Sequence, residues 1–225
     1  MSGTLLSVII PIYNEKTTCL KLIEKVKAIP IDKEIIVVND GSTDGSREIL
    51  ESISGINLIH HDYNCGKGSA VQTAVPFCRG EYVILQDGDL EYDPIAYHNL
   101  LEPIINKDAD VVFGSRWLNQ GLKSSYHTRG NKIITWFSNL INGKSITDVA
   151  SCYKVLPLKY FKALKIKSDG FGLETEIAAK VFRHGYSVVE VSVSYKRRKI
   201  EEGKKLRLID GIISAWSCLR FRFFD

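Results

Sequence analysis

Two aspartates separated by one glycine follow an apolar run that has the features of a buried strand. The run is Tyr82–Leu85, and Asp87, Gly88 and Asp89 stand where it would end. Carboxylates at this spacing can converge on one divalent cation, because the glycine leaves the backbone free to turn. A polar turn without a ligand is the alternative for such a short pattern. The position after a strand favours a cation site.

A second Asp-x-Asp pair in the same chain provides an internal comparison. Asp108 and Asp110 precede the apolar run Val111–Phe113 instead of following one. Ligands of open α/β sheets gather outside the carboxyl ends of the strands. We therefore predict that Asp87 and Asp89 lie at the functional edge of a sheet. The second pair is expected in a solvated turn at the opposite edge.

Apolar runs alternate with amphipathic segments along most of the chain. The predicted strands cover 5–10, 34–38, 56–59, 82–85, 111–113, a strand-like segment 148–154, and 187–195. The predicted helices lie around 20–26, at 46–52, up to 78, and at 94–105, 133–141, 171–184 and 206–224. This alternation predicts one α/β domain with a mostly parallel, Rossmann-like sheet flanked by helices. The polar loops after strands one, two and four should then meet at one edge.

The overall composition is that of a globular protein in a reducing compartment. The 225 residues are 44% hydrophobic and 25% charged, and the five scattered cysteines form no C-x-x-C pair. The N-terminus does not resemble a signal peptide, and no uncharged apolar stretch reaches the roughly 18–20 residues that span a bilayer. We expect a cytoplasmic protein that is in solution or peripheral on the inner face of a membrane.

Positive charge gathers at the C-terminal end. Residues 195–225 hold nine Lys and Arg against four Asp and Glu, a net charge of +5, and the rest of the chain sums to −1. The helix predicted there carries an apolar stripe at helical spacing, made of Leu206, Ile209, Ile212, Ile213, Trp216, Leu219 and Phe223. Such a stripe favours packing on the domain. The alternative is an interfacial helix that contacts an anionic membrane surface.

The basic residues of the second half suggest a ligand that carries phosphates. The candidates for phosphate contacts are Arg116, Arg129, Arg198, Lys204 and Lys205. The segment Gly66-Lys67-Gly68 lacks the spacing of either glycine-rich phosphate fingerprint, so a metal-bridged diphosphate is the better interpretation. Asp40 could bind a base or ribose or cap the next helix, Asp44 is interpreted as a cap, and Glu15 as either a ligand contact or a first-turn helix acid.

Three motifs together resemble the signature series of family 2 glycosyltransferases. They are VIIPIYNE at 8–15, VVNDGSTD at 37–44 and QDGDLEYDP at 86–94. The second half resembles the dolichyl-phosphate mannose/glucose synthase branch of that family. Its matching segments are GSR at 114–116, SCYK at 151–154, FGLETE at 171–176, and the stretch from Arg198 to Lys205. Related members often have Glu-Pro-Glu where this chain has Glu174-Thr175-Glu176.

This resemblance implies a GT-A fold, a nucleotide-sugar donor, Mg²⁺ or Mn²⁺, and inversion at the anomeric carbon. It implies that the donor contacts Pro11, Tyr13, Glu15, Asp40, Ser42, Lys67, Asp87, Gly88 and Asp89. It implies a metal at Asp87 and Asp89, with Glu91 as a further ligand. The expected division is a nucleotide-sugar-binding half at 1–115, an acceptor half at 116–205 and a C-terminal helix at 206–225.

The predicted reaction moves mannose or glucose from a GDP- or UDP-linked donor to a polyprenyl or dolichyl phosphate. The residues expected to carry the chemistry are Asp89, Arg116, Glu174 and Asp148, with Glu176 a further carboxylate to test. Transfer to a saccharide hydroxyl is the alternative acceptor chemistry. A nucleotidyltransferase would need a glycine-rich loop after strand one, and a nucleotide-sugar-binding module would bind the donor without turnover. We expect no nucleic-acid partner.

Overall fold

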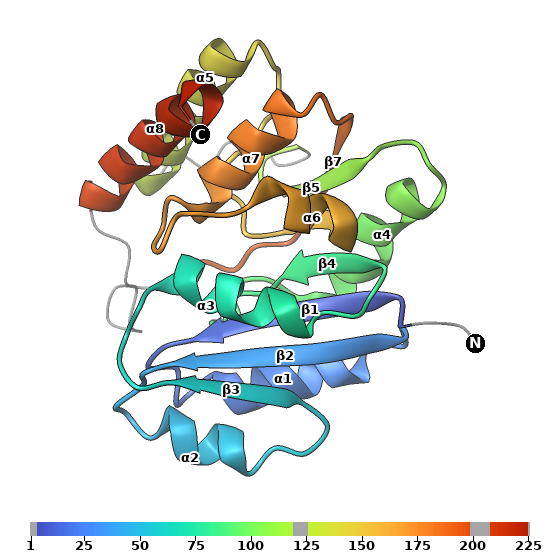
Figure 1. The fold of residues 1–225 in the computed structure, drawn as a ribbon, viewed down its shortest axis with the longest axis vertical. Coiled ribbons are helices and arrows are strands. Elements are labelled where there is room, and N and C mark those ends of the chain that lie inside the picture. Colours follow the sequence, from blue (N-terminus) through green and yellow to red (C-terminus); the bar gives the residue numbers. More distant parts are fainter. Residues whose placement is uncertain (1–3, 119–125, 199–207, 225) are drawn as a thin grey trace.

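One mixed sheet runs through the molecule (Figure 1). The computed structural model describes residues 4–118, 126–198 and 208–224, and of residues 126–129 and 208 the backbone alone. Within these residues the sheet has seven strands in the order β3-β2-β1-β4-β6-β5-β7. Their bounds are β1 Leu6–Ile12, β2 Lys33–Asp40, β3 Asn57–His61, β4 Tyr82–Leu85, β5 Val111–Ser115, β6 Lys154–Pro157 and β7 Val188–Ser192.

The predicted parallel sheet is confirmed for all strands but one. β1 pairs in parallel with β2 and β4, β2 with β3, and β5 with β7, whereas β6 is antiparallel to both of its neighbours. The arrowheads of β1, β2 and β3 therefore lie on one side, at the left of Figure 1. The residues of β1 and β4 are almost wholly buried because these strands are central.

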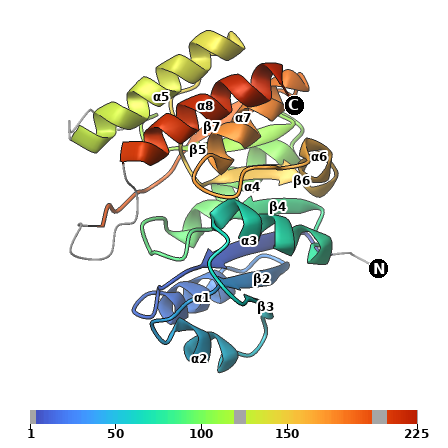
Figure 2. The same cartoon turned by 60° about the vertical axis from the view of Figure 1, so that its left-hand side comes forward.

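Helices cover both faces of the sheet. The α-helices are α1 Cys19–Ala28, α2 Ser46–Glu51, α3 Lys67–Ala74, α4 Tyr97–Ile105, α5 Tyr126–Asn142, α6 Leu158–Leu164, α7 Leu173–Arg183 and α8 Leu208–Phe223. Two short 3₁₀ helices are η1 Val75–Phe77 and η2 Pro94–Ala96. In Figure 1, α3 lies in front of the sheet and α1 behind it. Helices α5, α7 and α8 pack on one another, and Figure 2 shows α5 and α8 side by side.

The strand-like segment predicted over 148–154 is wrong for residues 148–153, which form a turn and irregular backbone. Only Lys154 belongs to a strand, β6. Its buried ammonium group donates hydrogen bonds to the carbonyl oxygens of Val149, at 3.0 Å, and Ser151. These two bonds curl the preceding residues back over the Lys154 side chain. An alternation of apolar and polar residues carries no information about such a contact.

Two helices differ from their predictions. α5 begins at Tyr126, seven residues before the predicted start at 133, because the polar residues 126–132 continue the helix. The short helix α6 follows Pro157 and has no predicted counterpart. Its seven residues contribute two buried side chains, Phe161 and Leu164, which is too short a pattern to reveal a helical period. The last predicted helix, 206–224, is α8, and residues 206 and 207 lie outside the described part.

The apolar stripe of α8 does not pack on the domain, which contradicts the favoured prediction. Ile212 and Trp216 are exposed, whereas the small residues Ser214, Ser217 and Cys218 are buried. Small side chains let this helix approach α5 and α7 closely. Of its large apolar side chains, Phe221 is buried, whereas five are exposed: Ile209, Ile212, Ile213, Trp216 and Phe223. In the described residues, no helix combines the length and the apolar character that a membrane crossing requires.

Candidate active site

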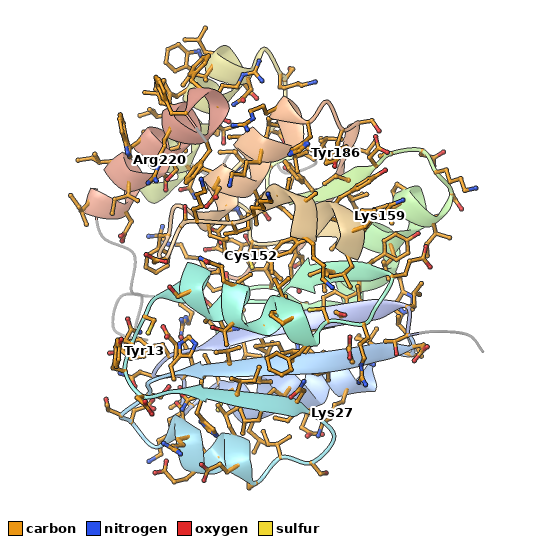
Figure 3. All side chains as sticks on the ribbon, in the orientation of Figure 1. Tyr13, Lys27, Cys152, Lys159, Tyr186 and Arg220 are labelled. Atoms are coloured by element: carbon orange, nitrogen blue, oxygen red, sulfur yellow. The ribbon has the colours of Figure 1, made fainter. Side chains whose placement is uncertain are left out.

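A cavity of about 1010 Å³ opens where the polar loops of the first half meet the second half. The predicted residues that line it are Pro11, Tyr13, Glu15, Asp40, Lys67, Asp87, Gly88, Asp89, Glu91, Arg116, Glu174 and Arg198. The prediction that the loops after strands one, two and four meet at one edge is thus confirmed. Figure 3 shows Tyr13 at the end of β1 and Cys152 between the two halves. What each residue binds stays a prediction.

Several predicted residues lie elsewhere. The Ser42 hydroxyl accepts a hydrogen bond from the backbone nitrogen of Asn14 at 3.0 Å, which ties two loops together, and it does not line the cavity. Asp148 lies beneath the cavity wall. Arg129 is in the first turn of α5, with only its backbone described. Lys204 and Lys205 lie outside the described residues, so their predicted phosphate contacts stay predictions.

Lys67 joins the two halves of the cavity. It is the first residue of α3, and its ammonium nitrogen lies 2.5 Å from Asp87 Oδ1 and 2.5 Å from Glu174 Oε1. Burial lowers the pKa of Lys67, but Asp87 and Glu174 outweigh it and hold this pKa well above its ordinary value. Lys67 is therefore a positive charge held between a carboxylate of the loop after β4 and one of α7.

The segment 66–68 lacks a phosphate fingerprint, and close packing accounts for the glycines on either side of Lys67. Gly68 donates a backbone hydrogen bond of 2.7 Å to the carbonyl oxygen of Asp169. A Cβ on Gly68 would overlap the carbonyl oxygen of Ser168, and one on Gly66 would overlap that of Asp169. These glycines let α3 approach the 168–170 backbone closely and so deliver Lys67 to the cavity.

Arg198 forms the second cationic contact of the acidic loops. Its guanidinium donates to both Glu15 oxygens, at 2.9 and 3.0 Å, and to Asp89 Oδ2 at 3.2 Å. Its backbone nitrogen donates to Glu91 Oε1 at 2.7 Å, and the Tyr195 hydroxyl donates to Glu91 Oε2 at 2.6 Å. Glu91 thus holds the segment 195–198 over the cavity. Its predicted role as a metal ligand stays a prediction.

Asp89 lies in a cluster with the carboxylates of Asp87 and Glu91, and its pKa is changed there. Burial, together with the neighbouring carboxylates Asp87 and Glu91, raises the pKa of Asp89 to about 7, against the opposing effect of Arg198. Concentrated negative charge of this kind attracts a cation, because a cation stabilises the ionised form of each carboxylate. The cluster is electrostatically prepared for a positive ligand.

Arg116 is held from behind by Asp148. Asp148 is fully buried and accepts two side-chain hydrogen bonds from Arg116, at 2.6 and 2.7 Å, and a third from its backbone nitrogen at 3.1 Å. The guanidinium also lies 5.1 Å from the centre of the Tyr195 ring. Arg116 lines the cavity and Asp148 does not, so Asp148 holds the Arg116 side chain in place. The predicted catalytic roles of both residues stay predictions.

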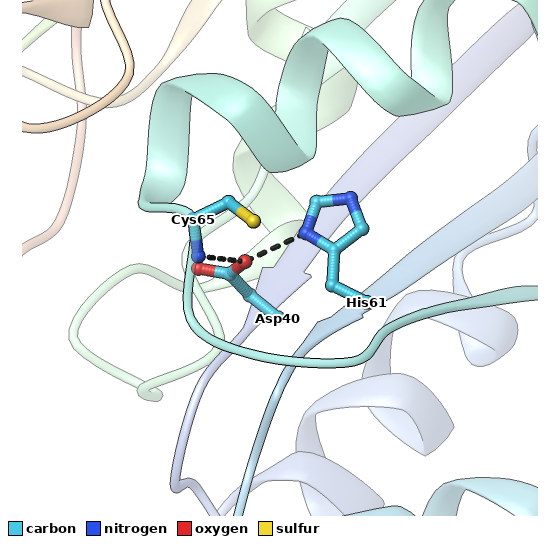
Figure 4. Close-up of side chains that lie close together, drawn as sticks. All are labelled: Asp40, His61 and Cys65. Carbon is cyan, nitrogen blue, oxygen red and sulfur yellow. Dashed lines mark hydrogen bonds and ion pairs between the residues drawn. The ribbon is translucent and has the colours of Figure 1, made fainter.

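Asp40 is the hub of a hydrogen-bonded loop (Figure 4). It lies 2.7 Å from His61 Nδ1 and accepts backbone hydrogen bonds from Cys65 and Gly66, both at 2.8 Å. In the described residues, Asp40, His61 and Cys65 are the one group of three or more such side chains whose potential metal-ligand atoms all lie within 4.8 Å of one another. The second His61 nitrogen lies 2.9 Å from the Thr73 hydroxyl, so this group is already satisfied internally. The structure presents it as a loop anchor, and a direct ligand contact of Asp40 stays a prediction.

The comparisons with known proteins converge on one family. The profile of Glycosyl transferase family 2 matches residues 7–164, more than half of the chain. The chain is a family 2 glycosyltransferase. It is 30% identical over 194 residues to glycosyltransferase AglJ of Haloferax volcanii, covering 85% of this chain and 63% of that protein. It is 25% identical over 210 residues to the undecaprenyl-phosphate mannosyltransferase of Micrococcus luteus, covering 87% and 85%.

Solved structures show the same fold. Glucosyl-3-phosphoglycerate synthase of Mycobacterium tuberculosis, in complex with Mn²⁺, uridine diphosphate and phosphoglyceric acid, superimposes with a TM-score of 0.72. It shares 19% identity, and the match covers 98% of this chain and 78% of that one. The predicted GT-A fold is therefore confirmed, and this family 2 glycosyltransferase has a mixed, mostly parallel sheet flanked by helices.

The carboxylate ligands that this glycosyltransferase offers at the cavity fit a hard divalent cation. Asp87 and Asp89 line the cavity, and both are partly exposed. Magnesium-type ions in phosphate-transfer sites use one or two carboxylates and complete their shell with substrate phosphates and water. Two carboxylates, which pair with Lys67 and Arg198 in this structure, suit this arrangement better than a closed protein cage does.

Sequence analysis missed the apolar part of the cavity wall. Ile134, Phe171 and Ile209 line it from α5, the loop before α7, and α8. The buried thiol of Cys152 also lines it, and burial raises the pKa of that thiol well above its ordinary value. The same two helices also line the cavity with polar residues, Asn131 from α5 and Asp210 and Ser214 from α8. The signal is visible only once the helices are packed.

Proposed function

We propose that this glycosyltransferase moves mannose or glucose from a GDP- or UDP-linked donor to a polyprenyl phosphate of the dolichyl type, with inversion and with Mg²⁺ or Mn²⁺. The observation that carries this proposal is the two-part cavity wall. One side is lined by Asp87, Asp89 and Arg198, and the other by Ile134 and Ile209. A nucleotide diphosphate suits the first side, and a phosphate on a hydrocarbon chain suits the junction of the two.

We divide the proposed roles among three segments of the chain. We assign donor binding to residues 1–115, acceptor binding to 116–205, and the edge of the acceptor entrance to the helix of 206–225. Asp87 and Asp89 would hold the cation, which supplies positive charge to the diphosphate when bound. Arg116 and Arg198 would contact phosphate oxygens of donor or acceptor. The mannosyltransferase name of the Micrococcus luteus relative supports the lipid-phosphate acceptor.

The proposed step needs little proton transfer. An oxygen of the acceptor phosphate attacks the anomeric carbon, the bond from that carbon to the donor diphosphate breaks, and the bonding electrons leave with the nucleoside diphosphate. The second pKa of a phosphate monoester is near ~6, so at neutral pH the acceptor is already an anion. Arg116, Arg198 and Lys67 would then stabilise the charge that gathers on the leaving group.

Transfer to a saccharide hydroxyl is the second candidate. A hydroxyl must lose a proton as it attacks, which requires a carboxylate within reach of the cavity. Glu174 lines the cavity, and its Oε1 is paired with Lys67. Glu174 is therefore the carboxylate on which the two acceptor classes differ.

The test supplies the protein and Mn²⁺ with radiolabelled GDP-mannose or UDP-glucose, each with a short-chain polyprenyl phosphate, and counts label in the organic phase. We expect lipid-phase label from one donor. It should disappear with EDTA and in Asp89→Asn, and persist in the matched control Asp108→Asn at the opposite edge of the sheet. This result would identify both donor and acceptor class.

Two other outcomes would redirect the proposal. Donor consumption without lipid-phase label would refute the phosphate acceptor. If, in addition, Glu174→Gln removed the chemical step while donor binding persisted, a hydroxyl acceptor would replace it. If the protein consumed neither GDP-mannose nor UDP-glucose when both were tested within a panel of nucleotide sugars, the proposed donors would be refuted.

A further inference from the structure

The outer side of α5 and α8 is an exposed apolar face with no covering element among the described residues. We name it the α5–α8 face and define it by Ile133, Trp136, Leu140, Ile212, Trp216 and Phe223, all exposed. On α5 the three residues repeat at helical spacing, and on α8 the other three do the same. Because α5 and α8 pack together, the two stripes form one surface. Contiguous exposed apolar surface of this kind marks an interaction site.

The inner side of α8 shows that this arrangement is not a by-product of helix packing. Ser214, Ser217, Cys218 and the large side chain of Phe221 are buried against the domain, while Trp216 is 59% exposed. A helix stabilised by its own domain alone would bury most of its larger apolar side chains and expose the serines. Apart from Phe221, α8 shows the opposite pattern, so its apolar side has no partner among the described residues.

The charged residues of α5 and α8 indicate which kind of partner covers the α5–α8 face. α5 contains no acidic residue, and α8 contains only Asp210, which lines the cavity. Arg220, exposed and labelled in Figure 3, lies on α8 near Phe223 in sequence, and Arg222 is half-buried. A second copy of this face would bring like charges together, whereas an anionic lipid surface complements them. Tryptophan and phenylalanine beside arginine suit the region between lipid headgroups and acyl chains.

The face is continuous with the active-site cavity. Ile134, one residue from Ile133, and Ile209, three residues from Ile212, both line the cavity. The two helices are neighbours here, because a Cβ added at Gly211 would lie 3.9 Å from the Ile134 side chain, an ordinary van der Waals contact. The cavity therefore reaches the edge of the apolar face where α5 and α8 approach each other.

We propose that the α5–α8 face lies on an anionic phospholipid bilayer and that the hydrocarbon chain of the acceptor enters the cavity from there, between Ile134 and Ile209. The docking part stands on the face alone, and the entry route rests on the proposed function. The protein lies on the bilayer surface in this arrangement, with the donor-binding loops of β1 and β4 toward water.

The docking test floats the whole protein with vesicles of phosphatidylcholine alone and with added phosphatidylglycerol at low salt. We expect flotation with the anionic vesicles. Ile212→Asp should lower the partition by about tenfold or more, because a charge replaces a side chain that enters the bilayer. Ile95 is exposed to the same degree, 67%, but lies on η2 away from this face, so Ile95→Asp should float as the wild type does.

A second measurement follows the tryptophans. The emission of Trp136 and Trp216 should shift to the blue with anionic vesicles, and Ile212→Asp should lose this shift while its far-UV spectrum is unchanged. Absence of flotation on both vesicle types would overturn docking. So would equal flotation of Ile212→Asp, or a concentration-dependent dimer that Ile212→Asp dissociates, because a second copy would then cover the face.

Transfer assays separate this proposal from the proposed function. Ile212→Asp should match the wild type with a short-chain acceptor in solution and lose activity with a long-chain polyprenyl phosphate held in vesicles. Vesicle binding without transfer to either acceptor would refute the proposed function and leave docking intact. Transfer to the short chain without vesicle binding would refute docking and leave the function intact.

Discussion

The molecule uses ion pairs in two different ways, at the cavity and beneath it. At the cavity, Lys67 pairs with Asp87, and Arg198 pairs with Asp89 and the buried Glu15. The side chains of Asp87 and Asp89 are partly exposed. Beneath it, Arg116 pairs with Asp148, whose side chain is fully buried. The first kind of pair can exchange a partner for a ligand at small cost. The second kind cannot, because a buried charge that loses its partner is strongly unfavourable.

Two glutamates on α7 illustrate this difference within one turn of helix. Glu174 lines the cavity and pairs with Lys67. Glu176 is fully buried, pairs with Lys180 at 2.7 Å, and accepts backbone hydrogen bonds from Lys167 and Ser168 at 2.8 and 2.7 Å. Glu176 therefore holds the loop before α7 in place, and only Glu174 is available to a ligand. The predictions below test this division.

The largest expected effect is on stability. Asp148→Ala leaves the Arg116 guanidinium without its buried partner, so we expect the free energy of unfolding to fall by about 3–5 kcal/mol. Urea denaturation measures this change. Asp108→Ala, at an exposed aspartate, should change stability by less than about 0.5 kcal/mol. A loss below about 1 kcal/mol for Asp148→Ala would mean that the two kinds of ion pair do not differ.

Asp87→Asn should separate activity from stability. We expect donor turnover to fall by about 10²–10³-fold, the usual cost of one charge-stabilising group. The stability should change by no more than about 1 kcal/mol, because Lys67 keeps Glu174 as a partner. Initial rates and thermal melts on the same preparation measure the two effects. A large stability loss with unchanged turnover would place Asp87 among the structural carboxylates.

Lys154 should make stability depend on pH. Burial, opposed by Glu174 and Asp148, lowers the pKa of Lys154 from 10.5 to about 8. Between about pH 8 and 10.5 the unfolded chain therefore binds the proton more readily than the folded chain, so the Lys154 contribution to stability rises with pH across this window. The change amounts to up to about 2–3 kcal/mol.

The measurement compares the wild type with Lys154→Met by urea denaturation across this pH range. Subtraction removes the titration of all other groups. The difference in unfolding free energy should move in favour of the wild type as pH rises from 8. A flat difference would show that Lys154 is less buried in solution than in the structure.

The smallest effect is expected at an ion pair on the surface. Lys25 and Asp93 lie 2.7 Å apart with 41% and 44% of their side chains exposed. Lys25→Ala should lower stability by about 0.2–1 kcal/mol and lose that effect in high salt, because exposed pairs are screened. Thermal melts at two salt concentrations test this. A loss as large as that of Asp148→Ala would show that burial does not set the scale.

The sequence pattern correctly predicted the edge of the sheet at which the cavity opens. Asp87 and Asp89 line the cavity, whereas Asp110 accepts hydrogen bonds from the backbone and hydroxyl of Ser187 at the opposite edge. Asp44 was predicted as a cap, but the N-cap of α2 is Gly45; Asp44 precedes it and accepts from the backbone nitrogen of Ser46 at 2.9 Å. These features depend on residues close in sequence and on the direction of each strand, both of which a local pattern contains.

The antiparallel strand and the outward stripe of α8 could not be predicted in this way. β6 lies antiparallel between β4 and β5. At its start, the Lys154 side chain holds the preceding turn through hydrogen bonds to two carbonyls. The stripe of α8 has the same periodicity whether it faces the core or solvent. Periodicity determines that a helix has an apolar side, not which way that side turns.

The sequence by itself thus determined an α/β sheet, its functional edge and the acidic residues on it, since apolar runs and turn residues act over a few positions. Only the tertiary structure decided which carboxylates face the cavity and which are enclosed beneath it. Glu174 and Glu176 are the same residue type two positions apart, and Asp89 and Asp148 are both aspartates. Their burial and partners depend on segments up to 109 residues away, as with Asp89 and Arg198, and such separations leave no local pattern.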